Sequence, residues 1–259
     1  MQDLDDKVVL VTGGGRGIGR AIALAFASQK SRVAIVGRTP ATLDDVAEEI
    51  RRLGAEALPR VCDVTQKPAV EKLKQEIAGR FGAVQVLVNN AGMAPAAGFL
   101  EMPDSLWEEV LRVNLTGTYN RCKVFLADML AARWGRIINI ASTVAKVAYS
   151  HISAYAASKH AVLGLTRSLA VETAKFGVTV NAVCPGYVNT DLTRQNALLI
   201  AQKRGKPLEH GLEIFAGTSP QKRLIEPAEV AHLTVMLAST AAQGITGQAI
   251  NVDGGAVMV

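Results

Sequence analysis

The chain has 259 residues, of which 49% are hydrophobic and only 5% aromatic, and it carries a formal net charge of +5. This length and composition suit one large α/β unit whose sheet is rich in aliphatic side chains. The basic residues are scattered, without a Lys/Arg block, so we expect no nucleic-acid partner. The acidic start MQDLDDKVVL and the lack of a long apolar run predict no signal peptide and no membrane span, which is typical of a cytoplasmic protein.

Three cysteines, Cys62, Cys122 and Cys184, form no CxxC pair and leave one cysteine unmatched. This number and spacing indicate neither a disulfide framework nor a zinc site, so we expect no metal. Because free cysteine behaves as a small hydrophobic residue, we predict three reduced thiols in the core.

Short apolar runs alternate with longer helical patterns along the whole chain. Parallel strands joined by helical crossovers form a doubly wound sheet with helices on both faces, and ligands bind at the carboxyl ends of its strands. No repeat, low-complexity tract or Pro/Gly linker divides the chain, so we predict one α/β domain over residues 1–259. The seven predicted strands are 7–13, 32–37, 57–64, 84–92, 136–142, 178–186 and 248–255, and the predicted helices are 17–30, 40–53, 67–81, 104–132, 152–176 and 227–238.

The first predicted strand ends in TGGGRGIG, residues 12–19, and continues directly into a helix. Glycine at Gly13, Gly17 and Gly19 allows a tight turn and a close approach of the backbone to a pyrophosphate, with Ile18 in the same loop. The N-terminus of the following helix then faces the negative charge. A tight turn without a ligand is the alternative, but the strand before the loop and the helix after it favour dinucleotide binding.

Several motifs at successive strand ends together resemble the short-chain dehydrogenase/reductase family along nearly the whole chain. The resemblance implies a single Rossmann-type domain and hydride transfer between a nicotinamide cofactor and a CH–OH/C=O pair. The motifs are the glycine spacing, NNAG at 89–92, Asn114, Ser142, the pair Tyr155 and Lys159, and PG at 185–186.

The second predicted strand ends in VGRTP, where an acidic residue would select NAD by binding the ribose 2′-hydroxyl. Gly37 occupies that position, Arg38 follows it, and Arg16 lies in the glycine loop. Two guanidinium groups at the adenosine ribose pair well with a phosphate dianion. This arrangement favours NADP(H) over NAD(H), and the alternative is two exposed arginines without a ligand.

The resemblance also assigns residues at later strand ends to the cofactor. Asp63 is expected at the adenine amino group, Val64 at the adenine ring, and Asn90 in the adenosine pocket. The backbone of Val188 and the hydroxyl of Thr190 are expected at the nicotinamide carboxamide. Helix capping by Asp63 and ordinary turn formation at Asn90 and after the sixth strand are the alternatives.

Tyr155 and Lys159 lie one helical turn apart, on the same face of the predicted helix 152–176. Reduction of a carbonyl needs an acid as alkoxide charge develops, and a nearby ammonium is expected to lower the phenol pKa from about 10. Lys159 is also expected to bind the nicotinamide ribose. A surface pair is the alternative, but small residues on this helix predict close packing: Ala154, Ala157, Ala161, Gly164 and Ser168.

Two further residues complete the predicted catalytic set. Ser142, at the end of the fifth strand, is expected to donate a hydrogen bond to the substrate oxygen. Asn114 resembles the family residue that holds a water linked to Lys159. Since asparagine is unfavourable inside a helix, we predict a local distortion of the helix there.

Residues 190–219 are too long for a simple connection before the last helix and are predicted to form a substrate lid. By family resemblance we expect a homotetramer that pairs through the helices 104–132 and 152–176 and the apolar C-terminal tail. His151 is expected either at the substrate pocket or in a solvated loop.

The segments 138–160 and 178–191 are most similar to bacterial 3-oxoacyl-thioester reductases and aromatic polyketide ketoreductases. The leading hypothesis is therefore reduction of a 3-oxoacyl group on coenzyme A or an acyl carrier protein. Arg133 and Lys175 could attract an acidic carrier, but Phe176 stands where carrier reductases often have a second arginine, which favours coenzyme A or a free ketone. The alternatives are a dehydrogenase of a small secondary alcohol, polyol or cyclic ketone, and a dinucleotide-binding protein without catalysis.

Overall fold

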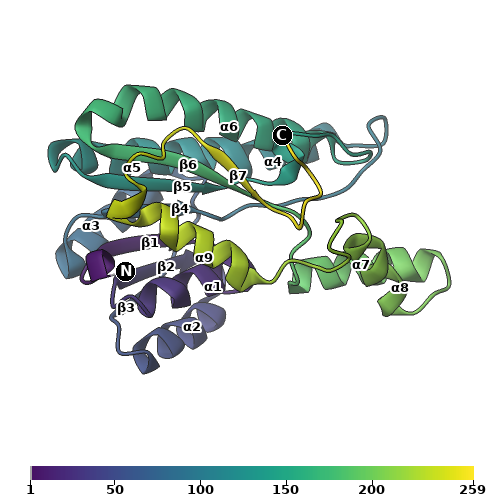
Figure 1. Cartoon of the computed structure of the whole chain (residues 1–259), viewed down its shortest axis with the longest axis horizontal. Coiled ribbons are helices and arrows are strands. Elements are labelled where there is room, and N and C mark those ends of the chain that lie inside the picture. The colour runs from purple at the N-terminus through teal and green to yellow at the C-terminus, as the bar shows by residue number, and fades with distance from the viewer. Residues whose placement is uncertain (1) are drawn as a thin grey trace.

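A computed structural model describes residues 2–259. Its centre is a sheet of seven parallel strands in the order β3-β2-β1-β4-β5-β6-β7 (Figure 1). The predicted doubly wound sheet is thereby confirmed. The strands are β1 (Val8–Thr12), β2 (Arg32–Gly37), β3 (Ala57–Val61), β4 (Val86–Asn89), β5 (Gly135–Ile140), β6 (Val178–Pro185) and β7 (Ala249–Val252).

Helices cover both faces of the sheet (Figure 1). One face packs on α1 (Gly17–Ala27), α2 (Pro40–Arg52) and α9 (Pro227–Ala238), whose apolar side chains share one core cluster with β1 and β2. The second core cluster joins α3 (Lys67–Phe81) and α5 (Gly117–Ala131) to the opposite side chains of the same strands. Since both faces are covered, β1, β4, β5 and β6 are buried along their whole length, which explains their nearly continuous apolar runs.

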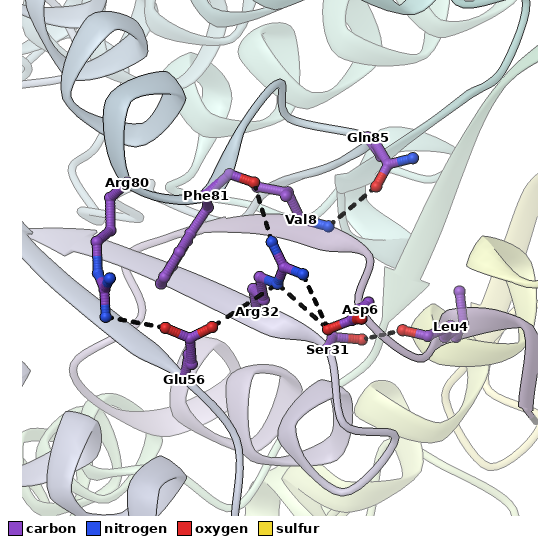
Figure 2. Close-up of polar contacts among 9 residues, drawn as sticks. All are labelled: Leu4, Asp6, Val8, Ser31, Arg32, Glu56, Arg80, Phe81 and Gln85. Carbon is purple, nitrogen blue, oxygen red and sulfur yellow. Dashed lines mark hydrogen bonds and ion pairs between the residues drawn. The ribbon is translucent and has the colours of Figure 1, made fainter.

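Polar contacts hold the amino ends of the first strands together (Figure 2). Arg32, at the start of β2, donates to Asp6 at 3.2 Å and lies 3.7 Å from Glu56, which also pairs with Arg80 at 2.9 Å. The backbone N–H of Val8 donates to the side chain of Gln85 before β4. These contacts lie at the edge of the sheet opposite the carboxyl ends of the strands, where parallel sheets of this kind bind ligands.

Some predicted boundaries differ from the structure. The expected helix 104–132 is divided into α4 (Asp104–Leu111), a π-helical turn (Arg112–Thr116) and α5, which confirms the distortion at Asn114. The insertion after β6 forms two unpredicted helices, α7 (Asp191–Lys203) and α8 (Leu208–Ala216), which project from the sheet (Figure 1).

The small-residue stripe on α6 (Ser153–Thr173) was expected to pack closely, and within the single chain only its first half does so. Ala154 is buried, but Gly164 and Ser168 are exposed, and a Cβ built on Gly164 meets no other atom within 4 Å. The three cysteines are free and buried, as predicted. Over residues 2–259, no helix is both long and apolar enough to cross a bilayer.

Candidate active site and cofactor cleft

The glycine loop between β1 and α1 forms a concave stretch of backbone, here called the glycine cradle, in which a larger side chain would be strained or would clash. Gly13 and Gly17 have positive φ angles of 65° and 54°, in the region that favours glycine. A Cβ on Gly19 would lie 2.1 Å from the carbonyl oxygen of Gly13, so any larger residue would push the loop away. The first turn of α1 has no side-chain cap, so its N–H groups are available to a phosphate. Ile18 packs against the core beneath.

Asn90 braces this loop from the end of β4. Its Nδ2 donates to the carbonyl oxygens of Thr12 at 2.9 Å and Gly13 at 3.2 Å. The hydroxyl of Thr12 donates to Val88 and accepts from the backbone N–H groups of Asn90 and Ala91. The side chain of Asn90 therefore shapes the loop that would hold the pyrophosphate.

Arg16 and Arg38, which are expected near the adenosine, are exposed, and their side chains make no hydrogen bond or ion pair with residues 2–259. Asp63 lies close enough to Arg38 for the two charges to interact. Hydrogen bonds from the backbone and hydroxyl of Thr65 hold the pKa of Asp63 below its usual value. Asp63 thus closes a turn with Thr65 instead of capping α3, and Val64 beside it is buried.

The loop after β6 lies along the other side of the cleft. Val188 is buried and pairs with Ile225 in an isolated parallel bridge. The side chain of Thr190 caps α7, and a Cβ on Gly17 would meet its methyl group at 3.3 Å. The loop after β6 and the glycine loop therefore lie face to face, and the residues present fit a dinucleotide.

Lys159 extends from α6 under the end of β5. Its side chain is 7% exposed, Nζ donates to the carbonyl oxygen of Ile140 at 2.7 Å, and it lies 5.7 Å from the centre of the Tyr155 ring. The predicted neighbours on one helix face thus both point toward the carboxyl edge of the sheet.

Burial dominates the acidity of both groups. It raises the pKa of Tyr155 to about 12, against the opposing effect of a hydrogen bond with Ser142. It lowers the pKa of Lys159 to about 8, since the charged ammonium loses its hydration in the buried site. The structure therefore differs from the expectation that the ammonium would lower the phenol pKa: burial raises it, and the opposing effect comes from Ser142, while Lys159 Nζ lies 5.7 Å from the ring centre.

Asn114 lies in the π turn and is buried. Its side chain accepts from the backbone N–H of Met93 and donates to the carbonyl oxygen of the same residue, both at 2.9 Å. Nδ2 also donates to Ser158 Oγ at 3.0 Å, and Ser158 Oγ donates to the carbonyl oxygen of Tyr155 at 2.7 Å. Ser158 was not among the predicted site residues, although a small hydroxyl three residues after Tyr155, on the same side of the helix, was a usable signal.

Ser142 follows β5 by two residues, and its hydroxyl accepts from the backbone N–H of Val144 at 3.1 Å. Lys146, in the same turn, donates to the carbonyl oxygens of Ala249 and Val259, each at 2.7 Å. The turn that carries Ser142 is thus fixed by β7 and the last residue of the chain.

Aromatic side chains border the expected substrate side. Tyr187, after β6, stacks on Phe215 of α8 with ring centres 4.3 Å apart and an interplanar angle of 18°. His151 is exposed and has a positive φ of 65°, and its carbonyl oxygen accepts from Ala97. No group of three His, Cys, Asp or Glu within residues 2–259 could hold a metal ion.

Comparison with known proteins agrees with this geometry. The family model for short chain dehydrogenases matches residues 7–198. The chain belongs to the short-chain dehydrogenase family. This confirms the family resemblance and the assignment to the oxidoreductases.

Several named proteins are similar over nearly their whole length to this short-chain dehydrogenase. A putative ketoacyl reductase of Streptomyces coelicolor is 38% identical over 257 residues, 98% of each chain. The 3-oxoacyl-(acyl-carrier-protein) reductase of Aquifex aeolicus is 40% identical, covering 97% of this chain and 98% of the relative. A crystal structure of a variant actinorhodin polyketide ketoreductase with NADPH matches with a TM-score of 0.94, 38% identity and 99% coverage of both chains.

Proposed function

We propose that this short-chain dehydrogenase reduces the 3-oxo group of an acyl thioester with NADPH. The observation that carries the proposal is the meeting of Tyr155 and Ser142 above Lys159 at the carboxyl edge of the sheet, beside a glycine cradle that fits a dinucleotide. The similarity to a ketoacyl reductase and to a 3-oxoacyl reductase supports this substrate class.

In the proposed reaction, bound NADPH would supply a hydride to the carbonyl carbon. Tyr155, whose raised pKa keeps the phenol protonated near neutral pH, donates a proton to the carbonyl oxygen. Ser142 donates a hydrogen bond to the same oxygen as its negative charge grows. Lys159 holds the nicotinamide ribose, and Asn114 keeps the π turn against α6.

NADPH is preferred to NADH in this proposal because two cations and no acid lie at the end of β2. Arg16 and Arg38 are exposed and make no hydrogen bond or ion pair within residues 2–259, and Asp63 acts on Arg38 only at longer range, so a phosphate would be their first strong partner. The similar ketoreductase structure contains NADPH.

The proposal favours coenzyme A over an acidic carrier protein as the thioester carrier. Arg133 Nη2 already donates to the carbonyl oxygen of Lys175 at 2.9 Å, and its guanidinium lies 5.9 Å from the centre of the Phe176 ring. This cation is thus partly committed within the chain. Assays with acetoacetyl-CoA and with an acetoacetyl carrier protein distinguish the two.

A dehydrogenase of a small hydroxy acid or alcohol is the second candidate. A D-beta-hydroxybutyrate dehydrogenase of Cupriavidus necator is 37% identical over 257 residues, which favours this alternative. NADPH oxidation with acetoacetyl-CoA, compared with a panel of free ketones, polyols and 3-hydroxybutyrate, tests both. Turnover of the panel alone would overturn the thioester assignment, and cofactor binding without any turnover would indicate a non-catalytic binding protein.

We further propose that residues 190–219 act as a lid and that the protein is a homotetramer. Helices α7 and α8 project beside the site and are tied to it by the Tyr187–Phe215 stack. Exposed Gly164 and Tyr119, which is 44% exposed, lie on α6 and α5, where subunits are expected to pair. Light scattering that gives a monomer mass would overturn the tetramer.

A further inference from the structure

Arg121 of α5 is a fully buried cation with no carboxylate partner among residues 2–259. Its Nε donates to Asn89 Oδ1 at 2.6 Å and its Nη2 donates to Thr118 Oγ1 at 3.0 Å. Its Nη1 is buried and has no hydrogen-bond partner among residues 2–259. Burial lowers the pKa of Arg121 to about 10, so the guanidinium remains charged at neutral pH. A charge held in this way is costly, and the proposed reaction does not yet use it.

We propose that Arg121 is a positioning residue for the active site. Its buried guanidinium has two arms of hydrogen bonds. One arm fixes the main-chain carbonyl of Asn114, and the other fixes the position of helix α6 through two asparagine side chains. This inference rests on the proposed function, because it assumes that the residues on the π turn and on α6 carry out the reduction.

The first arm runs to the π turn. Thr118 Oγ1 donates its single proton to the carbonyl oxygen of Asn114 at 2.7 Å and accepts from Arg121. The turn is wider than an α-helical turn, since the backbone N–H of Gly117 pairs with Arg112, five residues earlier. Arg121 thus holds the hydroxyl that in turn holds the carbonyl of Asn114.

The second arm crosses the sheet to α6. Asn89 Nδ2 donates to Asn139 Oδ1, and Asn139 Nδ2 donates to Thr166 Oγ1, each at 2.8 Å. Thr166 Oγ1 then donates to the carbonyl oxygen of Val162 at 2.7 Å. All of these side chains are buried.

The direction of this chain follows from chemistry. An arginine can only donate, so Asn89 must turn its oxygen toward Arg121 and its amino group toward Asn139. Asn139 must then turn its own amino group toward Thr166. One obligate donor at the end of the chain therefore fixes both amides and the hydroxyl on α6, seven residues after Lys159 and on the same helix face.

The charge of Arg121 acts on Lys159 as well. It lowers the pKa of Lys159 in the same direction as burial does, whereas the thiol of Cys184 in β6 acts in the opposite direction. Tyr155 lies on the same helix, and the ionisable groups that act on Arg121 itself are the thiols of Cys62 and Cys122. Removal of the guanidinium should therefore favour the charged ammonium.

The test compares NADPH turnover, NADPH affinity and the pH dependence of kcat in purified variants. In Arg121→Met, we expect kcat to fall about tenfold to a hundredfold through misplacement of the site, with the NADPH Kd changed less than about twofold. The alkaline limb of the kcat profile should move to higher pH, because the cation that opposes Lys159 protonation is gone. Arg121→Lys keeps a positive charge, so the alkaline limb should return to its wild-type pH and kcat should recover in part.

Two further variants separate the roles. Thr118→Val breaks the first arm without removing the charge, so kcat should fall while the alkaline limb stays in place. Arg136→Met removes the other large buried arginine, 2% exposed and at the opposite edge of the sheet, and should change neither kcat nor the limb.

Wild-type kcat and an unmoved limb in Arg121→Met would overturn the inference, as would a loss of kcat that only follows the loss of folded protein. If Arg121→Met does not fold, Thr118→Val with wild-type kcat overturns it. Should the wild type reduce no 3-oxoacyl thioester, the same variants are compared on the ketone it does reduce. Hydrogen exchange of the α6 amides in the NADPH complex, faster in Arg121→Met than in Arg136→Met, reports the positioning without turnover, and equal exchange contradicts it.

Discussion

Asn114 Nδ2 donates a 3.0 Å hydrogen bond to Ser158 Oγ, and this bond joins the π turn directly to helix α6. Ser158 passes the contact on to the carbonyl oxygen of Tyr155. Ser158 therefore fixes the position of the helix that carries the proposed acid, although its hydroxyl is used by protein contacts on both sides and is not proposed to touch the substrate.

Ser158→Ala should lower kcat about tenfold, because loss of a buried hydrogen bond loosens the Asn114 contact by about 1 kcal/mol or more. The measurement is steady-state NADPH oxidation with the NADPH Kd from fluorescence titration. Ser153→Ala is the matched control on the same helix, since Ser153 Oγ is buried and has no hydrogen-bond partner among residues 2–259. Equal activity of the two variants would remove the role of Ser158.

Tyr155→Phe should abolish turnover and leave NADPH binding nearly intact, because the change removes one hydroxyl and keeps the ring. Lys159→Ala should lose both, since it removes the proposed ribose contact as well as the ammonium. Stopped assays over long times together with binding titrations check both variants. Retained activity in Tyr155→Phe would exclude it as the proton donor.

Arg38→Asp should reverse the cofactor preference. Loss of a charge-assisted hydrogen bond worth about 1.5 to 3 kcal/mol lowers kcat/KM for NADPH about tenfold to a hundredfold. The new carboxylate repels a 2′-phosphate but not a free ribose hydroxyl, so kcat/KM for NADH should not fall. Arg51→Asp makes the same charge change at an exposed position of α2 and should leave both values unchanged. A wild-type enzyme that already prefers NADH tenfold would contradict the assignment.

Ketone reduction should lose activity as the pH rises through about 8. Lys159 has a lowered pKa of about 8, so its ammonium is present below that pH and is neutralised above it. Tyr155, with a pKa of about 12, stays protonated throughout. The kcat profile for reduction should therefore be flat from pH 6 to 7 and fall about tenfold per pH unit well above 8, as for one titrating group. A flat profile to pH 10 would show that the charge of Lys159 is not needed.

Acid stability should depend on Glu229 at the start of α9. Arg223 donates two hydrogen bonds to its carboxylate, at 2.6 and 2.7 Å, and Glu226 donates through its backbone at 2.8 Å. These contacts lower the pKa of Glu229 to about 2, so the stabilisation is present above pH 4.5 and is lost as the pH falls toward 2.

Because the Glu229 pair is partly exposed, Glu229→Gln should cost only about 1 kcal/mol at pH 7, and less at pH 3. Thermal unfolding at the two pH values measures the difference. Glu48→Gln, which removes a more exposed pair with Arg52, is the control and should change Tm less. A cost of Glu229→Gln that grows on acidification would contradict the lowered pKa of this carboxyl.

The sheet could be predicted well from the sequence because its central strands are buried on both faces and therefore consist of nearly continuous apolar residues, as in Val8–Thr12. The distortion at Asn114 was also predictable, since a buried amide in a helix needs a partner outside the helix. The Tyr155 pKa was not, because acidity depends on how much solvent the folded chain removes.

Other parts of the site depend on contacts between distant segments. Helix α7 has only a weak apolar stripe in the sequence, and it packs on α8 through a close approach at Gly211, where a Cβ would lie 2.1 Å from the carbonyl oxygen of Ala197. The role of Arg121 depends on Asn89 and Asn139, which are far from it along the chain. Spacing within one segment could not reveal such a network.

The hydroxyl of Thr12 has a consequence for how the protein folds. It joins β1 to the end of β4, strands separated by more than seventy residues but adjacent in the sheet. Contacts between segments so far apart form late, because a long loop must close first. The glycine loop should therefore reach its final shape only when β4 has paired with β1. The time at which NADPH binding appears during refolding then reports the formation of this strand pair.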